Sequence, residues 1–341
     1  MKKSFQNILH FISALLVTIV LLHFYGNTLE TNVRNFYRSE ICDCDTLRYK
    51  EFNDSSGVPY INYFSISGKH IGIKRNPTFV SFAADKYFQD ITTDGNETNF
   101  QNCVHWILEN AVTEDSCLFI PYKYAWVYDL KPGWKSAMGQ GLAIKTLTQE
   151  YQLTHDSVYL AKIELFLNLF YKTVDEGGIT YKTNQNEWWF EEYAQEKGLK
   201  PHILNGMMYA LHGLYYNYVN TKNERSLMLF SKGISSLKAS LPEYDNANNL
   251  SFYDSKKNVA SEYYHNIHLR FLLEFYNITH EKIFSDYYQK WSKVKPESYF
   301  QKSVQNLNKT FVVLFTGVLI IVYLMILLLK VFLKKFFCKA T

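Results

Sequence analysis

Carboxyl and phenol side chains recur between predicted helices in the second half of this 341-residue chain. Glu192 and Tyr193 follow an aromatic run, and Tyr253 and Tyr264 lie just before and inside a later helix. Carboxyl groups and phenols accept and donate protons, and the ordinary pKa of a phenol is about 10. These residues therefore indicate a site for acid–base chemistry between helices.

Other polar residues lie at the starts of predicted helices. Asn205 and Tyr209 are four residues apart, so on a helix their side chains point to the same side. Gln140 lies between two glycines, which leave it room to reach outward, and Ser136 precedes the same helix. Each candidate also has a simpler interpretation, as a helix cap, a core residue or part of an acidic surface loop.

Taken in order, these segments resemble the C-terminal catalytic domain of the D-glucuronyl C5-epimerases, which invert C5 of glucuronic acid residues within a polysaccharide. The resemblance runs from about residue 76 to 293 and is densest between residues 132 and 268. It is carried by residues 134–141, Glu192-Tyr193, Leu204-Asn205-Gly206, Tyr253-Asp254 and Tyr264-His265.

Inversion at C5 requires two acid–base groups that flank the sugar ring, because a proton leaves one face and another returns to the opposite face. The resemblance implies Glu192, Tyr253 and Tyr264 as the catalytic residues. A phenol could also act as a base if a nearby cation lowered its pKa. The developing negative charge needs cations or hydrogen-bond donors at the carboxylate.

The resemblance also implies a set of substrate contacts and two departures from the family. Lys256 and Ser261 stand where the family usually has arginines, and the loop between Tyr253 and Tyr264 is shorter than usual. Lysine supplies a point charge without the planar fork of arginine. No metal or dissociable cofactor is expected, because the histidines form no recognisable ligand set. The expected substrate contacts are Tyr193, Asn205, Tyr209, Gln140, Lys256, His265 and Ser136.

Hydrophobic periodicity predicts a mainly α fold. Short connections between consecutive helices imply antiparallel pairs, which form an α/α barrel, and the resemblance implies the same fold. The apolar residues of the helix at 156–173 leave little polar surface, which predicts an inner helix. A hairpin is expected at residues 179–193, and short strands form a small β subdomain between residues 49 and 80. The other helices are expected at 79–88, 99–112, 138–153, 202–220, 224–241, 259–276 and 279–292.

Two apolar runs, residues 8–25 and 311–329, are long enough to cross a bilayer. The first could instead be a cleaved signal peptide. Lysines at both ends of the chain place both termini in the cytoplasm and the middle in a lumen or outside the cell, in the Golgi or a bacterial envelope. The expected domains are an anchor at 1–25, a stalk and β subdomain at 26–80, the barrel at 81–295, and a linker, membrane helix and basic tail at 296–341.

That orientation exposes Cys42, Cys44, Cys103 and Cys117 to an oxidising compartment, with Cys338 in the reducing tail. Cys103 with Cys117 would close a short loop, and buried free thiols are the alternative. The formal charge of +4 is spread along the chain, which argues against a nucleic-acid partner. The expected partners are a uronic acid polysaccharide and a membrane, and a homodimer stays open.

The sequence thus predicts a membrane-anchored uronosyl C5-epimerase that converts D-glucuronic to L-iduronic residues. A polysaccharide lyase is the first alternative, since it removes the same C5 proton and then expels the C4 substituent. A non-catalytic polysaccharide-binding subunit of an envelope assembly complex is the second.

Overall fold

The computed structural model describes residues 2–36, 50–66, 69–182, 184–247, 249–294, 297–305 and 307–337. The chain divides into two compact units, and each is described by itself. One unit combines residues 1–45 with residues 296–341, and the other spans residues 46–295.

The first unit is a pair of long helices, α1 (Lys2–Phe36) and α11 (Lys309–Phe337), that pack against each other, with the short α10 (Tyr299–Gln305) packed against α1. Two stretches, Phe5–Arg34 and Lys309–Phe332, are long and apolar enough to cross a membrane. Residues 26–36 continue α1, so the predicted unpatterned stalk is wrong over this stretch. The reason lies partly in an ion pair of 2.5 Å between Arg34 and Glu30, one helical turn apart.

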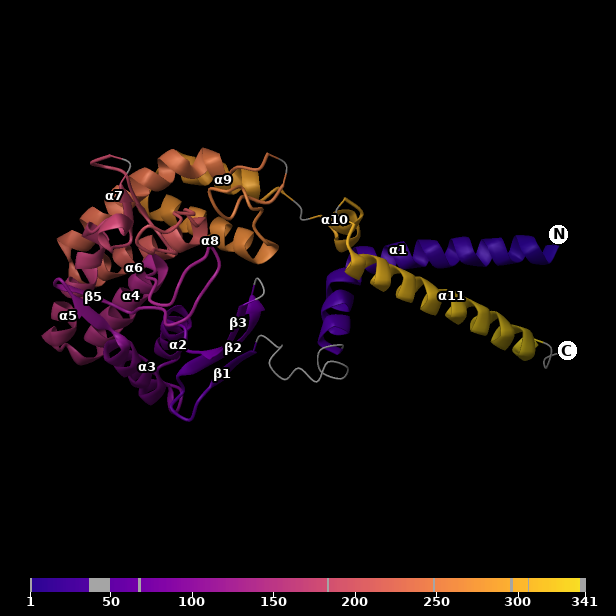
Figure 1. The fold of residues 1–341 in the computed structure, drawn as a ribbon, viewed down its shortest axis with the longest axis horizontal. Helices are drawn as coiled ribbons and strands as arrows, with labels where there is room; N and C mark the ends of the chain where they lie inside the picture. The colour runs from indigo at the N-terminus through magenta and orange to yellow at the C-terminus, as the bar shows by residue number, and fades with distance from the viewer. Residues whose placement is uncertain are drawn as a thin grey trace. The chain divides into compact units, whose positions relative to one another are not determined.

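The second unit is built from consecutive helix pairs (Figure 1). Helices α2, α4, α6 and α8 pack side by side as an inner row, and each packs against the helix that follows it, so α3, α5, α7 and α9 form an outer row. The predicted α/α fold of helical hairpins is confirmed. The bounds are α2 Pro77–Gln89, α3 Asn96–Asn110, α4 Ala137–Thr154, α5 Ser157–Asn168, α6 Leu204–Thr221, α7 Glu224–Ser240, α8 Glu262–Thr279 and α9 Lys282–Trp291.

Helix α4 is an inner helix, because its residues 137–150 are all buried. The prediction that the helix at 156–173 is an inner helix is wrong, because α5 buries only Ile163, Phe166 and Leu167. Two glycines explain how α4 lies so close to α6. A Cβ on Gly141 would meet the backbone of α6 at 2.7 Å, and a Cβ on Gly213 would meet the backbone of α4 at 2.0 Å.

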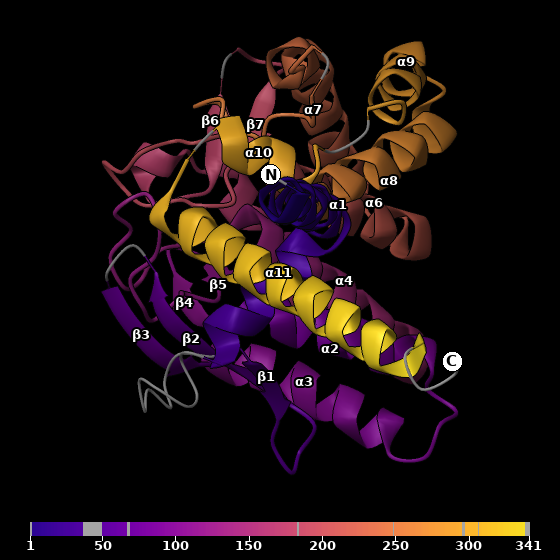
Figure 2. The same ribbon diagram turned by 90° about the vertical axis from the view of Figure 1, so that its right-hand side faces the viewer.

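In the described part of the chain, three small antiparallel sheets accompany the helices (Figure 2). Strands β1 (Lys50–Asn53), β2 (Pro59–Ile66) and β3 (Lys69–Lys74) confirm the expected β subdomain, and β6 (Thr180–Lys182) with β7 (Trp188–Phe190) confirms the expected hairpin. The hairpin of β4 (Val112–Glu114) and β5 (Cys117–Phe119) was not predicted. Its two turn residues, Asp115 and Ser116, have positive φ without the glycine that usually marks such a turn.

The two cysteines in the described ranges are free, buried thiols, so the pairing of Cys103 with Cys117 is wrong and the alternative holds. Burial among apolar side chains raises the pKa of Cys103 to about 12, so this thiol is inert. Cys42, Cys44 and Cys338 lie outside the described residues.

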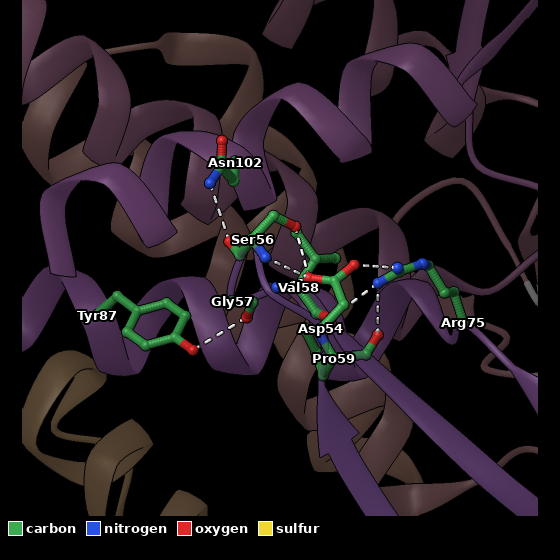
Figure 3. Close-up of polar contacts among 8 residues, drawn as sticks. All are labelled: Asp54, Ser56, Gly57, Val58, Pro59, Arg75, Tyr87 and Asn102. Carbon is green, nitrogen blue, oxygen red and sulfur yellow. Dashed lines mark hydrogen bonds and ion pairs between the residues drawn. The ribbon is translucent and has the colours of Figure 1, made fainter. Parts of the chain in front are cut away.

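The turn between β1 and β2 is fixed to the helices by polar contacts (Figure 3). The carboxylate of Asp54 accepts hydrogen bonds from the backbone N–H and the hydroxyl of Ser56, at 2.9 and 2.5 Å, and forms an ion pair with Arg75. Tyr87 of α2 and Asn102 of α3 donate to backbone carbonyls of the same turn, at 3.0 and 2.9 Å. Burial opposes ionisation, but the hydrogen bonds and the arginine lower the pKa of Asp54 to about 2.

Candidate active site

A cavity of about 600 Å³ lies at the N-terminal ends of the four inner helices. This volume is within the usual range for small-molecule sites. Residues from the first turns of α2, α4, α6 and α8 contribute to its wall. Its lining comprises Tyr63, Asn76, Thr78, Phe79, Phe82, Tyr122, Trp126, Trp134, Ser136, Met138, Glu192, Tyr193, Asn205, Tyr209, Tyr263, Tyr264 and Ile267.

The convergence of helix starts gives this cavity its electrostatic character. Helix N-termini carry partial positive charge from unpaired N–H groups. Asn76 and Ser136 cap α2 and α4 by accepting hydrogen bonds from backbone N–H groups at 2.9 and 3.1 Å. None of the described residues that line the cavity is a lysine, arginine or histidine. Backbone N–H groups and neutral side chains are therefore the hydrogen-bond donors that the described lining offers to a negative charge.

Glu192 is the carboxylic acid in the cavity wall. It is 9% exposed, and its Oε2 has no hydrogen-bond partner within the described part of the chain. Burial raises its pKa to about 8, with the nearby Tyr193 hydroxyl acting against this shift. Gly206 makes the position possible, because a Cβ there would lie 2.3 Å from the Glu192 carboxylate. The first turn of α6 thus lies directly against this acid.

The preceding residue, Glu191, has a structural role. Its fully buried carboxylate pairs with the ring of His202 and accepts a hydrogen bond of 3.1 Å from the His202 backbone N–H. Burial raises the pKa of Glu191, and the contacts with His202 oppose that effect. Because side chains alternate along an extended segment, only Glu192 is left to face the cavity.

Three tyrosines continue the wall from Glu192. Tyr193 and Tyr264 line the cavity, and Tyr253 lies behind them. The Tyr253 ring is 4.8 Å from the Tyr264 ring between centroids, and its hydroxyl is 3.4 Å from that of Tyr193. The two predicted catalytic phenols therefore lie in contact with each other, and Tyr264 shares the cavity with Glu192.

The structure contradicts a lowered phenol pKa at this site. Burial and the charge of Glu192 raise the pKa of Tyr264 to about 12 and hold the pKa of Tyr253 well above its ordinary value. The reason is that no lysine or arginine lies in the described lining to stabilise a phenolate. These phenols are neutral and are suited to donate protons.

Four of the seven predicted substrate contacts line the cavity. They are Ser136, Tyr193, Asn205 and Tyr209. Asn205 is 2% exposed, and its Oδ1 has no hydrogen-bond partner among the described residues. An unpartnered buried amide oxygen is costly, so it indicates a donor supplied by a ligand.

The other three predicted contacts lie outside the lining. Gln140 donates from Nε2 to two backbone carbonyls at 2.6 and 3.1 Å and is part of the core. His265 is buried, with Nδ1 2.9 Å from the Ser251 hydroxyl. Lys256 is exposed, and its Nζ lies 5.2 Å from the centroid of the Tyr128 ring.

Several wall residues were not predicted from the sequence. Tyr63 comes from β2 and receives a hydrogen bond of 2.7 Å from Asn76, while the hydroxyls of Tyr122 and Thr78 are 2.7 Å apart. The alternation of apolar and polar residues in the β subdomain could have indicated Tyr63, because this pattern is typical of a sheet with one face covered by other parts of the protein. Arg270 was also missed: it is exposed on α8, with its guanidinium carbon 5.5 Å from the centroid of the Tyr209 ring.

Comparison with known proteins decides the family. Residues 115–293, more than half of the chain, match the family model described as the D-glucuronyl C5-epimerase C-terminus. The chain belongs to the D-glucuronyl C5-epimerase family. It is accordingly a carbohydrate epimerase, an isomerase. The matched range of this C5-epimerase family member includes Glu192, Tyr253 and Tyr264 but begins after Tyr63 and Asn76, so part of the cavity wall lies outside it.

Two relatives match this chain over different fractions of their own length. An uncharacterized protein of Methanocaldococcus jannaschii is 31% identical over 260 residues, which cover 70% of this chain and 83% of that protein. The D-glucuronyl C5-epimerase of Caenorhabditis elegans is 31% identical over 181 residues, covering 48% of this chain and 29% of the worm protein. Among solved structures, a cellobiose 2-epimerase from Bacillus thermoamylovorans has a TM-score of 0.48 at 10% identity, covering 69% of this chain and 61% of that one.

Proposed function

We propose that this family member is a uronosyl C5-epimerase that converts D-glucuronic to L-iduronic residues within a polysaccharide. One observation carries the proposal: a buried carboxyl group, with one oxygen that has no hydrogen-bond partner among the described residues and a pKa of about 8, shares a cavity with a neutral phenol. Acid–base catalysis is most effective when the pKa of the base is near the working pH. Glu192 meets this condition, and Tyr264 supplies the second group.

In the proposed reaction the ionised carboxylate of Glu192 removes the proton from C5. The electron pair of the C–H bond moves into the sugar carboxylate, which becomes a dianion. The Tyr264 hydroxyl then gives its proton to the opposite face of C5, which leaves a phenolate and a protonated Glu192. The phenolate regains a proton at the end of the cycle. We assign this return to Tyr193 and Tyr253, whose hydroxyls are 3.4 Å apart and of which Tyr253 packs its ring against that of Tyr264.

We assign recognition of the sugar carboxylate to neutral hydrogen-bond donors and to the N-terminal ends of the helices that line the cavity. The N-terminal ends of α4 and α6 favour negative charge, and they act in a site shielded from bulk water, where such dipoles count for more. Arg270 adds a full positive charge beside Tyr209. This arrangement replaces the two arginines that the family usually has at positions 256 and 261.

We also propose that α1 and α11 anchor the enzyme in a membrane, as their length and apolar composition allow. Under the positive-inside rule, the lysines next to both helices favour cytoplasmic termini. Residues 46–295 would then face the Golgi lumen or the bacterial cell exterior, where a polysaccharide substrate is available.

The test is to incubate the full chain with heparosan, both unsulfated and N-sulfated, in deuterium oxide and to follow C5 by NMR. The expected result is deuterium at C5 without chain cleavage. An unsaturated product with ultraviolet absorbance would show a lyase instead. Binding of the polymer without any deuterium exchange would show a non-catalytic subunit.

A further inference from the structure

A second cavity, of about 410 Å³, lies in the same unit and has the opposite charge character. We call it the basic cavity. Three of its residues are cationic and two are large aromatics, which is the composition that binds anionic sugars. It is lined by Ile73, Lys74, Arg75, Pro77, Trp106, Asn110, Ile120, Pro121, Lys123 and Tyr124.

The basic cavity and the candidate active site share a wall. In the segment that follows β5, Tyr122 lines the active site whereas Lys123 and Tyr124 line the basic cavity. At the start of α2, Asn76 lines the active site and its neighbours Arg75 and Pro77 line the basic cavity. The two cavities are therefore neighbours on opposite sides of the same two segments.

Tyr124 connects the two sides of that wall. Its ring centroid is 5.6 Å from that of Tyr63 and 5.7 Å from that of Trp126, and both of these residues line the active site. The wall is thus one aromatic layer thick at this point. A polymer that leaves the active site has only a short distance to cover.

Two of the cations in the basic cavity are available for a ligand. Within the described ranges no carboxylate lies within ion-pair distance of Lys74 or Lys123, and Lys123 contacts only the neutral amide of Asn110, at 3.3 Å. Arg75 is different, because its guanidinium is held by Asp54 and by backbone carbonyls of the β1–β2 turn (Figure 3). The turn fixes the segment that carries Lys74.

We propose that the basic cavity binds a second uronic acid residue of the same polysaccharide, away from the residue that reacts. The two lysines would hold its carboxylate, and the half-buried Trp106 would contact the sugar face, whereas Tyr124 is buried and forms the base of the cavity. The reacting site contains no lysine or arginine in its described lining, so this second site would supply the attraction for a polyanion. The identity of the polymer rests on the proposed function.

The test compares the affinity of the full chain for heparosan and for heparosan whose carboxyl groups have been reduced to alcohols. Wild type should bind the native polymer more tightly. The double variant Lys74→Ala/Lys123→Ala should lose about tenfold in affinity for the native polymer, as expected for two partly exposed charges, and should bind the reduced polymer like wild type. Its KM for the polymer should rise, with kcat unchanged.

Lys162→Ala, on the outer helix α5, is the matched control and should bind both polymers like wild type. Equal binding of the two polymers by wild type, or an unchanged affinity of the double variant, would overturn the proposal. The wild-type comparison does not depend on how well a variant folds. If deuterium exchange fails while the charge-dependent binding is found, the epimerase function is wrong and the binding site stands.

Discussion

Two carboxyl groups in the same unit, one half-buried and one buried, have opposite properties. Asp54, in the β1–β2 turn, is surrounded by donors and has a pKa of about 2. Glu192, which follows β7 and lies against the first turn of α6, has an oxygen without a partner among the described residues and a pKa of about 8. The Asp54 side chain keeps 29% of its surface exposed whereas Glu192 is 9% exposed, so the two groups differ in burial as well as in hydrogen bonding.

The difference comes from what surrounds each group. At Asp54 the donors and the arginine repay the loss of water and stabilise the charged form. At Glu192 the chain leaves the carboxyl group without this compensation, which costs stability but creates a base that works near neutral pH. The first group fixes the β1–β2 turn and ties it to Arg75, and the second is available for chemistry.

The largest expected effect is on the rate of proton exchange. Glu192→Gln keeps the size of the side chain but removes the base, so the rate of deuterium entry at C5 should fall by about 10³-fold. Glu187→Gln, in the same hairpin but outside the cavity lining, should keep wild-type activity. Equal activity in the two variants would remove Glu192 from the mechanism.

The second prediction separates the two phenols that contact each other. Tyr264→Phe should lower kcat by about 10²-fold, because it removes the proposed donor from the cavity wall. Tyr253→Phe should have a smaller effect, about tenfold, because this residue lies behind the wall and only passes the proton on. Single-turnover NMR of both variants measures the order, and a reversed order would exchange their roles.

The third prediction displaces the base without changing its chemistry. Gly206→Ala places a Cβ 2.3 Å from the Glu192 carboxylate, so the carboxylate or α6 must shift. The rate should fall roughly 10- to 100-fold, the usual effect of misplacing a catalytic group. Helical content by circular dichroism should stay unchanged. Full activity would mean that the position of Glu192 is not critical.

The fourth prediction concerns pH. The base must be ionised, so kcat/KM should rise about tenfold per pH unit below about 8 and level off above it. The phenols should not titrate in this range, because the pKa of Tyr264 is about 12 and burial holds the pKa of Tyr253 well above its ordinary value. Initial rates between pH 5 and 10 test this, and a profile that is flat from pH 5 to 8 would contradict the raised pKa.

The smallest expected effects are on stability and have opposite signs for the two carboxyl groups. Asp54→Asn should lower the free energy of unfolding by about 1–2 kcal/mol at pH 7, and the stabilisation by Asp54 should be lost as the pH falls from 3.8 to about 2. Glu192→Gln should instead raise stability above pH 4.5, by about 1–3 kcal/mol at pH 7, since the folded state disfavours the charged acid. Denaturant unfolding at several pH values measures both, and shifts of the same sign would refute the comparison.

The sequence determined the local features of this chain. Periodicity identified the helix pairs, the hairpin before Glu192 and the β subdomain, because the burial of one helix or strand face leaves a regular pattern. It misjudged α5, since an apolar composition does not say which neighbours cover a helix. The resemblance identified Glu192 and Tyr264 as members of one site.

Only the tertiary structure decided how the hydrogen bonding and the pKa of a site residue such as Glu192 differ from those of its neighbours in sequence. Glu191 and Glu192 are adjacent and chemically identical, but contacts with His202, eleven residues away, occupy one and leave the other free. Likewise, Tyr63 and Asn76 reach the cavity from segments far from Glu192 in sequence. The physical reason is that a pKa and a cavity depend on distances and burial between segments remote along the chain, which no local pattern of residues records.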